Sequence, residues 1–234
     1  MNNSSTIIIL QLLLNLAAAS SAPSFSLDAE NNTFLRNGKP HRYVSGSIHY
    51  FRVLPSSWRD RLEKIRLLGA NTITTYIEWS SHEPQPGSFV FSGNQDIVSF
   101  IKTAQDVGLD VILRSGPFMD AERDFGGLPA WLLKNQDIKL RTNDKYYMER
   151  VNLWFSKLFS LLSPLLFKNG GPIIMIQIEN EYGSYALQTG HKDIQYLTDL
   201  RDMVRRLVNS SWSISGGEFE CCSSGGRERV VLHN

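Results

Sequence analysis

Four apolar, strand-like segments alternate with four helix-like segments, and this alternation constrains the fold more than any other feature of the chain. The strand-like segments are rich in β-branched residues, which fit the surface of a sheet. They are residues 42–50, 71–79, 110–116 and 173–178. Because a helix after each strand returns the chain to the same end of the sheet, consecutive strands run parallel. The sequence therefore predicts a parallel sheet covered by helices.

The helix-like segments have recognisable ends. Pro55 is expected to open the first helix, and Gly69 lies where a glycine commonly ends one. Asn94 is expected to cap the second helix. The third spans about residues 146–167 and should bend or end near Pro164. The fourth carries an apolar side made of Ile194, Leu197, Leu200, Val204 and Leu207.

Two architectures satisfy this pattern, a (β/α)₈ barrel of the TIM type and an open, doubly wound sheet. No glycine-rich phosphate loop follows the first strand or any other, which disfavours a nucleotide-binding sheet and favours the barrel. A complete barrel needs ~250 residues. The predicted fold class is therefore α/β, a TIM (β/α)₈-barrel type in which only the first four or so βα units are present.

Composition excludes several classes of function. The 24 basic and 23 acidic side chains nearly cancel, so no basic stripe indicates a nucleic-acid partner. Only two cysteines occur, Cys221 and Cys222, and neighbours in sequence cannot join distant segments. The fold must therefore be stabilised by its core. No ligand set with metal spacing surrounds His49 or His82, so neither a metal nor another cofactor is expected.

The N-terminus predicts a separate targeting segment. Residues 7–19 form an apolar run that is shorter than the ~20 residues of a membrane span and is followed by small residues. We interpret residues 1–22 as a signal peptide; the alternative is a buried first helix. In the secretory pathway the sequons at Asn31 and Asn209 would be acceptors for N-glycosylation. The expected product is a glycoprotein that is secreted or lysosomal/vacuolar, with no membrane span.

Two carboxylates follow the fourth strand at once. Glu179, Asn180 and Glu181 come directly after the apolar run that ends at Ile178. In a barrel the carboxyl ends of the strands carry the catalytic groups. A carboxyl group among apolar neighbours holds its proton more tightly and can act as a general acid. Spacing does not decide which glutamate has that role, and the alternative is that both are solvated loop acids or that one pairs with an arginine.

Three long stretches resemble one known family. "GGPIIMIQIENEYGSY" (170–185) is similar to the acid/base strand of glycoside hydrolase family 35, the β-galactosidases. The stretches 42–93 and 108–133 are similar to the first two units and the third unit of the family's catalytic barrel. The resemblance covers about residues 25–208, which we interpret as a partial catalytic (β/α) barrel domain.

The resemblance implies a retaining hydrolase that releases terminal β-D-galactosyl residues in carbohydrate metabolism, with a β-galactoside oligosaccharide or glycoconjugate as substrate. It assigns the proton donor to Glu181 and makes Glu179 a supporting residue paired with an arginine. It assigns the substrate contacts to Tyr76, Ala121, Glu122 and Asn180. Hydrogen bonds to the sugar 2-hydroxyl, which the resemblance gives to Asn180, strengthen in the transition state of such reactions.

Simpler interpretations remain open for several of these residues. Tyr76 could be only a packing aromatic, and Glu122 could form a salt bridge with Arg114 or Arg123 instead of binding sugar. In the other direction, either Trp79 or Trp131 could form a sugar-stacking wall.

The loop after the third strand departs from the family pattern. The family usually has Pro or Ile, Tyr, Cys and Trp at the positions of Ser115, Phe118, Asp120 and Arg123. The charges of Asp120 and Arg123 therefore change the wall of the expected pocket, whereas Ala121 and Glu122 keep the family's pattern.

The family's motifs stop near Val208, and residues 209–234 are expected to form a flexible tail. Glu218 in "GGEFE" is too close to Glu181 to be the nucleophile, so none is assigned in this chain. The chain is therefore expected to lack the nucleophile half. The alternatives are a non-catalytic galactose-binding or interaction remnant and a related barrel enzyme such as a β-mannosidase or endoglucanase. The first and fourth strands would leave open hydrophobic edges prone to self-association.

Overall fold

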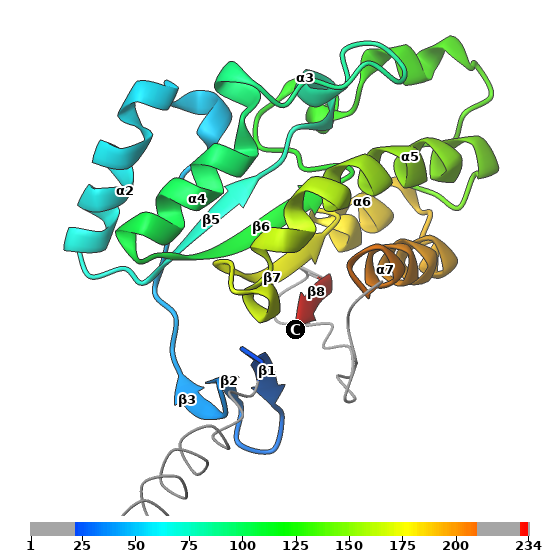
Figure 1. The fold of residues 1–234 in the computed structure, drawn as a ribbon. Coiled ribbons are helices and arrows are strands. Elements are labelled where there is room, and N and C mark those ends of the chain that lie inside the picture. The colour runs from blue at the N-terminus through cyan, green and yellow to red at the C-terminus, as the bar shows by residue number, and fades with distance from the viewer. Residues whose placement is uncertain (1–21, 210–229, 234) are drawn as a thin grey trace, which may run out of the picture.

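The structure is a computed structural model, and it describes residues 22–209 and 230–233. These residues form a five-stranded main sheet with helices on its outer side and a separate three-stranded sheet near the N-terminus (Figure 1). The predicted signal peptide and most of the predicted tail lie outside the described residues.

The main sheet confirms the predicted order of four parallel strands. The strands are β4 (Ser45–Ser47), β5 (Thr72–Tyr76), β6 (Asp110–Gly116), β7 (Ile173–Ile178) and β8 (Val230–His233), adjacent in that order. Strands β4 to β7 pair in parallel, as in a (β/α)₈ barrel. Strand β8 instead pairs antiparallel with β7, whereas the next strand of a barrel would be parallel. The sequence did not predict this strand.

The helices lie along the outer face of the main sheet, with α2 beside α4 and α7 beside α5 (Figure 1). They are α2 (Trp58–Leu67), α3 (Trp79–His82), α4 (Ile97–Val107), α5 (Lys145–Leu162), α6 (Tyr182–Thr189) and α7 (Ile194–Asn209). Short 3₁₀ turns occupy Tyr50–Arg52, Pro55–Ser57, Gly93–Gln95, Asp124–Gly127, Ala130–Lys134, Ser163–Leu165 and Phe167–Asn169.

The predicted helix ends are partly confirmed. Helix α5 ends at Leu162 and Pro164 follows in a 3₁₀ turn, as its missing N–H predicts. The expectation that Asn94 caps α4 is wrong, because Asn94 lies inside a preceding 3₁₀ turn. Asp96 caps the helix instead, and its Oδ1 accepts a hydrogen bond from the Ser99 N–H at 2.9 Å.

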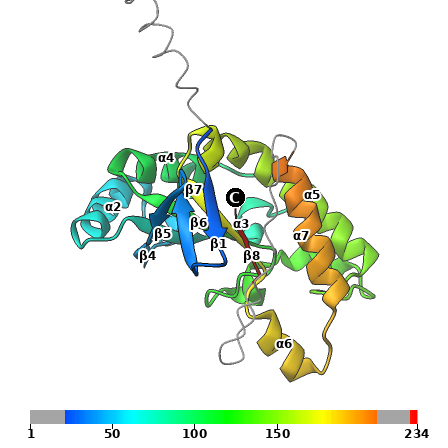
Figure 2. The ribbon, with the colours of Figure 1, turned by 90° about the horizontal axis from the view of Figure 1, so that it is seen from below.

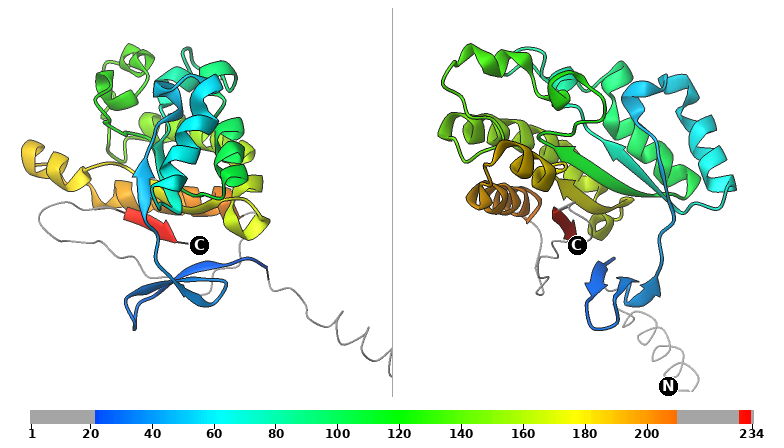
Figure 3. Two further views of the ribbon diagram at one scale, coloured as in Figure 1. Left: turned by 90° about the vertical axis from the view of Figure 1, so that its left-hand side faces the viewer. Right: turned by 180° about the vertical axis from the view of Figure 1, so that it is seen from behind.

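The N-terminal sheet consists of the antiparallel strands β1 (Phe25–Asp28), β2 (Thr33–Arg36) and β3 (Lys39–His41). Seen from below it lies in front of the strands of the main sheet (Figure 2), and both side views draw it below the helices (Figure 3). Phe25 packs with Ile112 and Met175 of the main sheet, and Arg36 forms an ion pair with Asp110 at 3.1 Å. Because Asp110 begins β6, the N-terminal sheet adjoins the amino end of the main sheet.

The edges of the main sheet differ from the expectation of two open hydrophobic strands. Strand β7 is covered by β8, so it is not an edge. Strand β4 is an edge, but it is only Ser-Gly-Ser and both serines are exposed, so it is polar and short. Self-association through this edge stays a prediction. In the part of the chain that the structure describes, no helix combines the length and apolar character needed to cross a membrane.

Candidate active site

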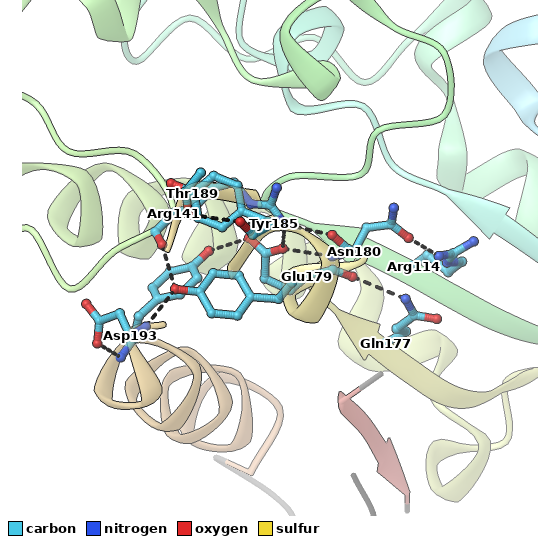
Figure 4. Close-up of polar contacts among 10 residues, drawn as sticks. Arg114, Arg141, Gln177, Glu179, Asn180, Tyr185, Thr189 and Asp193 are labelled. Atoms are coloured by element: carbon cyan, nitrogen blue, oxygen red, sulfur yellow. Dashed lines mark hydrogen bonds and ion pairs between the residues drawn. The ribbon is translucent and has the colours of Figure 1, made fainter. Parts of the chain in front are cut away.

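The carboxyl ends of β5, β6 and β7 bring two predicted site residues, Tyr76 and Asn180, together around Arg114. Tyr76 and Arg114 are register partners at the ends of β5 and β6. The Arg114 guanidinium donates to the Tyr76 hydroxyl and to Asn180 Oδ1, and its carbon lies 4.0 Å from the centre of the Tyr76 ring. Tyr76 is therefore more than a packing aromatic, because its hydroxyl accepts from the arginine that also binds Asn180. Figure 4 shows the Arg114–Asn180 contact.

Glu179 is a buried carboxylate whose hydrogen-bonding capacity is used. Its Oε2 accepts from Arg141 Nη2 at 2.6 Å and from the Asn180 N–H at 2.9 Å. Its Oε1 accepts from Arg141 Nε at 3.2 Å and from the Tyr196 hydroxyl at 2.7 Å (Figure 4). The expected pairing of Glu179 with an arginine is thus confirmed. A carboxylate that accepts four hydrogen bonds has no lone pair left to receive a substrate's proton.

Glu181 has the opposite environment. Its side chain is exposed, and its carboxylate makes no hydrogen bond or ion pair with the residues that the structure describes. Its backbone carbonyl accepts from the Tyr185 N–H at 3.0 Å and so starts helix α6. Strand alternation predicted no difference between the two glutamates. They differ because β7 ends at Ile178 and the chain turns immediately afterwards.

The turn after β7 has an uncommon backbone conformation. Glu179 and Glu181 adopt φ of 57° and 50°, in the left-handed region that non-glycine residues rarely occupy. Such residues cost about 1–3 kcal/mol each and persist only where the surroundings fix them. Asp120, Ala121 and Glu122 also have positive φ, so the two turns that carry predicted site residues share this feature.

The loop after β6 holds Ala121 and Glu122 next to Arg52. The Arg52 guanidinium donates to the Ala121 carbonyl, and its Nη2 lies 3.4 Å from Glu122 Oε2. The two alternative partners predicted for Glu122, Arg114 and Arg123, are therefore both wrong. Because the Glu122 side chain is 86% exposed, its ion pair with Arg52 is weak and leaves the carboxylate available to a ligand.

Arg123 forms an ion pair that sequence reasoning missed. Its Nη2 donates to Glu78 Oε2 at 3.1 Å, and its Nε donates to Glu78 Oε1. The Glu78 side chain is only 3% exposed, so the cation that replaces the family's usual tryptophan compensates a buried carboxylate. The sequence shows that Arg123 and Glu78 carry opposite charges. It does not show that they meet, because they are 45 residues apart.

Both histidines near the strand ends are held neutral. Burial, followed by the charges of Arg52 and Arg114, lowers the pKa of His49 to about 4, and its Nδ1 accepts from the Tyr76 N–H. Burial likewise lowers the pKa of His82 to about 4. Its Nδ1–H donates to the Val90 carbonyl, so Nε2 accepts from the Tyr50 hydroxyl at 2.5 Å. Neither joins a group of three metal-ligating side chains among the described residues.

The expectation of a sugar-stacking wall at Trp79 or Trp131 is wrong. Trp79 is fully buried and Trp131 is 7% exposed. Their indole N–H groups donate to Glu83, at 2.6 Å to the side chain and 2.8 Å to the carbonyl respectively. Both rings therefore belong to the core beneath the site.

Solved structures of glycoside hydrolases share this architecture. The exo-β-1,4-mannosidase Op5Man5 from Opitutaceae bacterium strain TAV5 matches with a TM-score of 0.58 and 14% identity, over 82% of this chain and 32% of that chain. GH5_18 from Streptomyces cattleya matches with a TM-score of 0.55 and 14% identity, over 71% of this chain and 42% of that chain. At this identity the likeness defines the fold alone, a partial TIM barrel.

The chain belongs to glycosyl hydrolases family 35, whose model matches residues 33–231. It is 51% identical over 181 residues to a β-galactosidase of Canis lupus familiaris, which covers 76% of this chain and 27% of that protein. It is 45% identical over 203 residues to β-galactosidase-1-like protein of Mus musculus, covering 87% and 31% respectively. The chain thus spans about a quarter to a third of these relatives. The matched range runs past Val208, where the recognisable motifs stop.

Proposed function

We propose that this chain supplies the acid/base part of a retaining β-galactosidase, with Glu181 as the proton donor. The observation that carries the proposal is the contrast between the two glutamates after β7. Glu179 is buried and its carboxylate accepts four hydrogen bonds, whereas Glu181 is exposed at the carboxyl end of the sheet beside Asn180. The family membership and the β-galactosidase relatives support the same reaction.

In this reaction Glu181 donates its proton to the oxygen of the leaving group while a second carboxylate attacks the anomeric carbon. Glu181 then removes a proton from the water that hydrolyses the covalent intermediate. A retaining site needs its two carboxyl groups ~5–5.5 Å apart. We assign no nucleophile to this chain and propose that the relatives' sequence beyond the matched quarter supplies it.

The proposed sugar contacts come from three loops. Asn180 Oδ1 accepts from Arg114, which orients its amide nitrogen as a donor for the 2-hydroxyl of galactose. Tyr76 would contact the sugar beside it. Arg52 donates to the Ala121 carbonyl, so the Ala121 N–H is the backbone group left to bind a galactose hydroxyl. The exposed Glu122 carboxylate would accept a hydrogen bond from a second hydroxyl.

The experiment joins this chain to the remaining barrel of the Canis lupus familiaris β-galactosidase after Asn209 and measures hydrolysis of a chromogenic β-galactoside. Loss of a general acid typically costs 10²–10⁴-fold in rate, so we expect a loss of about that size for Glu181→Gln. The matched control is Glu63→Gln, the same chemical change at an exposed position of α2. Activity that survives Glu181→Gln would reject the proposal.

A second candidate is galactose binding without hydrolysis, favoured by the small share of the relatives that the chain spans. Calorimetry and a chromogenic assay on the 234-residue chain separate the two functions. Binding of galactose together with absence of turnover would support this candidate for the chain alone, and turnover that depends on Glu181 would exclude it.

The proposed location is the secretory pathway, ending in secretion or in a lysosome or vacuole. The support is the apolar run at residues 7–19 and the sequon at Asn31, which is exposed in the turn between β1 and β2. In eukaryotic cells we expect a mass loss on treatment with a glycan-releasing amidase. Asn31→Gln should reduce that loss, and an unchanged mass in both would contradict the assignment.

A further inference from the structure

We infer that Arg141 and Glu179 form a positioning pair that fixes the turn 179–181 and thereby orients Asn180 and Glu181 toward a galactoside. This inference rests on the proposed function, because it concerns the same site. It gives the supporting role of Glu179 a physical content and adds Arg141, which lies in the loop before α5; neither residue touches the substrate.

The guanidinium of Arg141 binds the turn in two ways. It makes a two-pronged contact with the Glu179 carboxylate, Nη2 to Oε2 at 2.6 Å and Nε to Oε1 at 3.2 Å. The same Nη2 donates to the Asn180 carbonyl at 2.7 Å. Side chain and backbone of consecutive residues are thus held by one rigid, planar group (Figure 4).

The pair is buried and closely enclosed. The side chains of Arg141 and Glu179 are 8% and 3% exposed. The Arg141 guanidinium carbon lies 3.9 Å from the centre of the Phe118 ring and 4.3 Å from that of Tyr185. Burial disfavours the charged guanidinium, but the attraction of Glu179 outweighs it, so the pKa of Arg141 is raised. The contact therefore stays charged and geometrically restricted.

Three residues of this contact have left-handed backbone conformations. Arg141, Glu179 and Glu181 have φ of 56°, 57° and 50°. A turn of this kind persists only where surrounding interactions hold its backbone in place. The hydrogen bonds from Arg141 to Glu179 and to the Asn180 carbonyl do so here. Since Asn180 lies between the two glutamates, a change in either φ would move its amide and the carboxylate that follows.

The pair also joins the turn to two helices. The Tyr196 hydroxyl of α7 donates to Glu179 at 2.7 Å, and the Tyr182 hydroxyl of α6 donates to the Arg141 carbonyl at 3.1 Å. Burial, followed by the negative charge of Glu179, raises the pKa of Tyr196, which therefore remains a donor. The turn is consequently attached to rigid elements and not only to its own loop.

The test uses the 234-residue chain and measures galactose binding by ligand-observed NMR. The variants are Glu179→Gln, which keeps the shape of the side chain, and Arg141→Lys, which keeps the charge but not the fork of donors. The matched control is Asp110→Asn, the same carboxylate-to-amide change in an arginine pair at the other end of the sheet. Thermal unfolding of each variant is recorded in parallel.

Loss of one well-oriented hydrogen bond to the sugar corresponds to about a tenfold weaker affinity, which we expect for both site variants. Asp110→Asn should bind galactose within about twofold of the parent chain, because Asp110 lies at the other end of the sheet and distant sites rarely affect one another. Wild-type affinity in Glu179→Gln or in Arg141→Lys would overturn the inference. An equal loss of affinity in Asp110→Asn would overturn it as well, because a general loss of stability would then explain the effect.

If the parent chain binds no galactose, the candidate function of galactose binding by the chain alone is excluded. The acid/base proposal is still judged by Glu181→Gln in the joined protein, and the positioning pair is judged separately. Amide hydrogen exchange of residues 180–182, relative to that of β6, should then be about tenfold faster in both site variants than in the parent or Asp110→Asn. Unchanged exchange at these amides would overturn the inference independently of any ligand.

Discussion

The two ends of the main sheet are built differently although the same strands form both. At the carboxyl end, Arg141 and Glu179 are a buried ion pair and the adjoining turns have positive φ at non-glycine residues. At the amino end, the Arg36 side chain is 40% exposed in its pair with Asp110. Positive φ in the adjacent N-terminal sheet occurs at asparagine and glycine, which tolerate it.

The amino end also contains a cavity, so the presence of a cavity does not by itself mark the site. A cavity of about 500 Å³ lies between the N-terminal sheet and the start of β6, lined by residues that include Arg36, His41 and Asp110. Its one carboxylate is already paired with Arg36. The carboxyl end instead combines a strained backbone with two glutamates, Glu179 with all its hydrogen bonds formed and Glu181 exposed. Barrel enzymes carry their chemistry at this end of the sheet.

The largest expected effect comes from removing one carboxylate at each end. Glu179→Ala leaves Arg141 charged and buried, so we expect a loss of about 3–5 kcal/mol in the free energy of unfolding. Asp110→Ala should cost only about 1 kcal/mol, because Arg36 can reach water and burial already raises the pKa of Asp110 despite Arg36. Urea denaturation compares the two variants; equal losses would remove the contrast between the ends.

The second prediction concerns the pH dependence of stability near the carboxyl end. His82 has a pKa of about 4 when folded, against 6.5 for the free side chain, so protons bind preferentially to the unfolded chain. Stability present above pH 6.5 should therefore be lost as the pH falls toward 4, by up to about 3 kcal/mol.

His82→Gln keeps an acceptor for Tyr50 and should flatten this dependence in urea titrations between pH 6.5 and 4. The control His191→Gln makes the same chemical change at an exposed histidine. A slope that His82→Gln does not alter would show that other groups cause the loss.

Much of the fold was predictable because a buried parallel strand is a local, apolar pattern. Strands β5, β6 and β7 lie within the predicted segments for this reason. The N-terminal sheet was missed because its strands have three or four residues and mixed polarity. Asn37-Gly38, with φ of 53° and 72°, was the local signal that could have revealed its second turn.

The candidate site was less predictable because its partners are distant in sequence. The role of Glu179 depends on Arg141, 38 residues earlier, and on Tyr196, 17 residues later. Spacing after a strand indicates which end of the sheet a side chain occupies, but it carries no information on which loop will meet it. Likewise, the buried state of Trp79 depends on α5 and on Glu83, and not on its position after β5.

The third prediction compares a glycine at each end of the sheet. A Cβ at Gly171, before β7, would lie 2.0 Å from the Leu165 carbonyl oxygen, which is backbone and cannot rotate away. A Cβ at Gly126 would lie 1.9 Å from the Phe118 ring, which can move, but Gly126 also has a φ of +60°, where an alanine is strained. We expect overpacking losses of about 3 kcal/mol for Gly171→Ala and about 2 kcal/mol for Gly126→Ala in urea denaturation.

Ligand affinity should reverse the order of these two glycine variants. The Phe118 ring packs on Arg141, so its displacement by Gly126→Ala should weaken galactose binding, whereas Gly171→Ala should leave the affinity of the folded fraction unchanged. If Gly171→Ala lost more galactose affinity than Gly126→Ala, as it is expected to lose more stability, the carboxyl end would not be the part of the sheet that controls binding.

The smallest expected effect on stability tests whether Glu122 is a proposed sugar contact or only the partner of an ion pair. Glu122 is 86% exposed, and its contact with Arg52 is long at 3.4 Å. Glu122→Gln should change the free energy of unfolding by no more than about 0.5 kcal/mol. It should nevertheless weaken galactose binding, because an amide accepts hydrogen bonds from hydroxyls less strongly than a carboxylate. Asp106→Asn, which also loses an exposed partner of an arginine, is the control at the other end of the molecule. If Glu122→Gln binds galactose as the parent does, the Glu122 side chain is not a contact of the sugar.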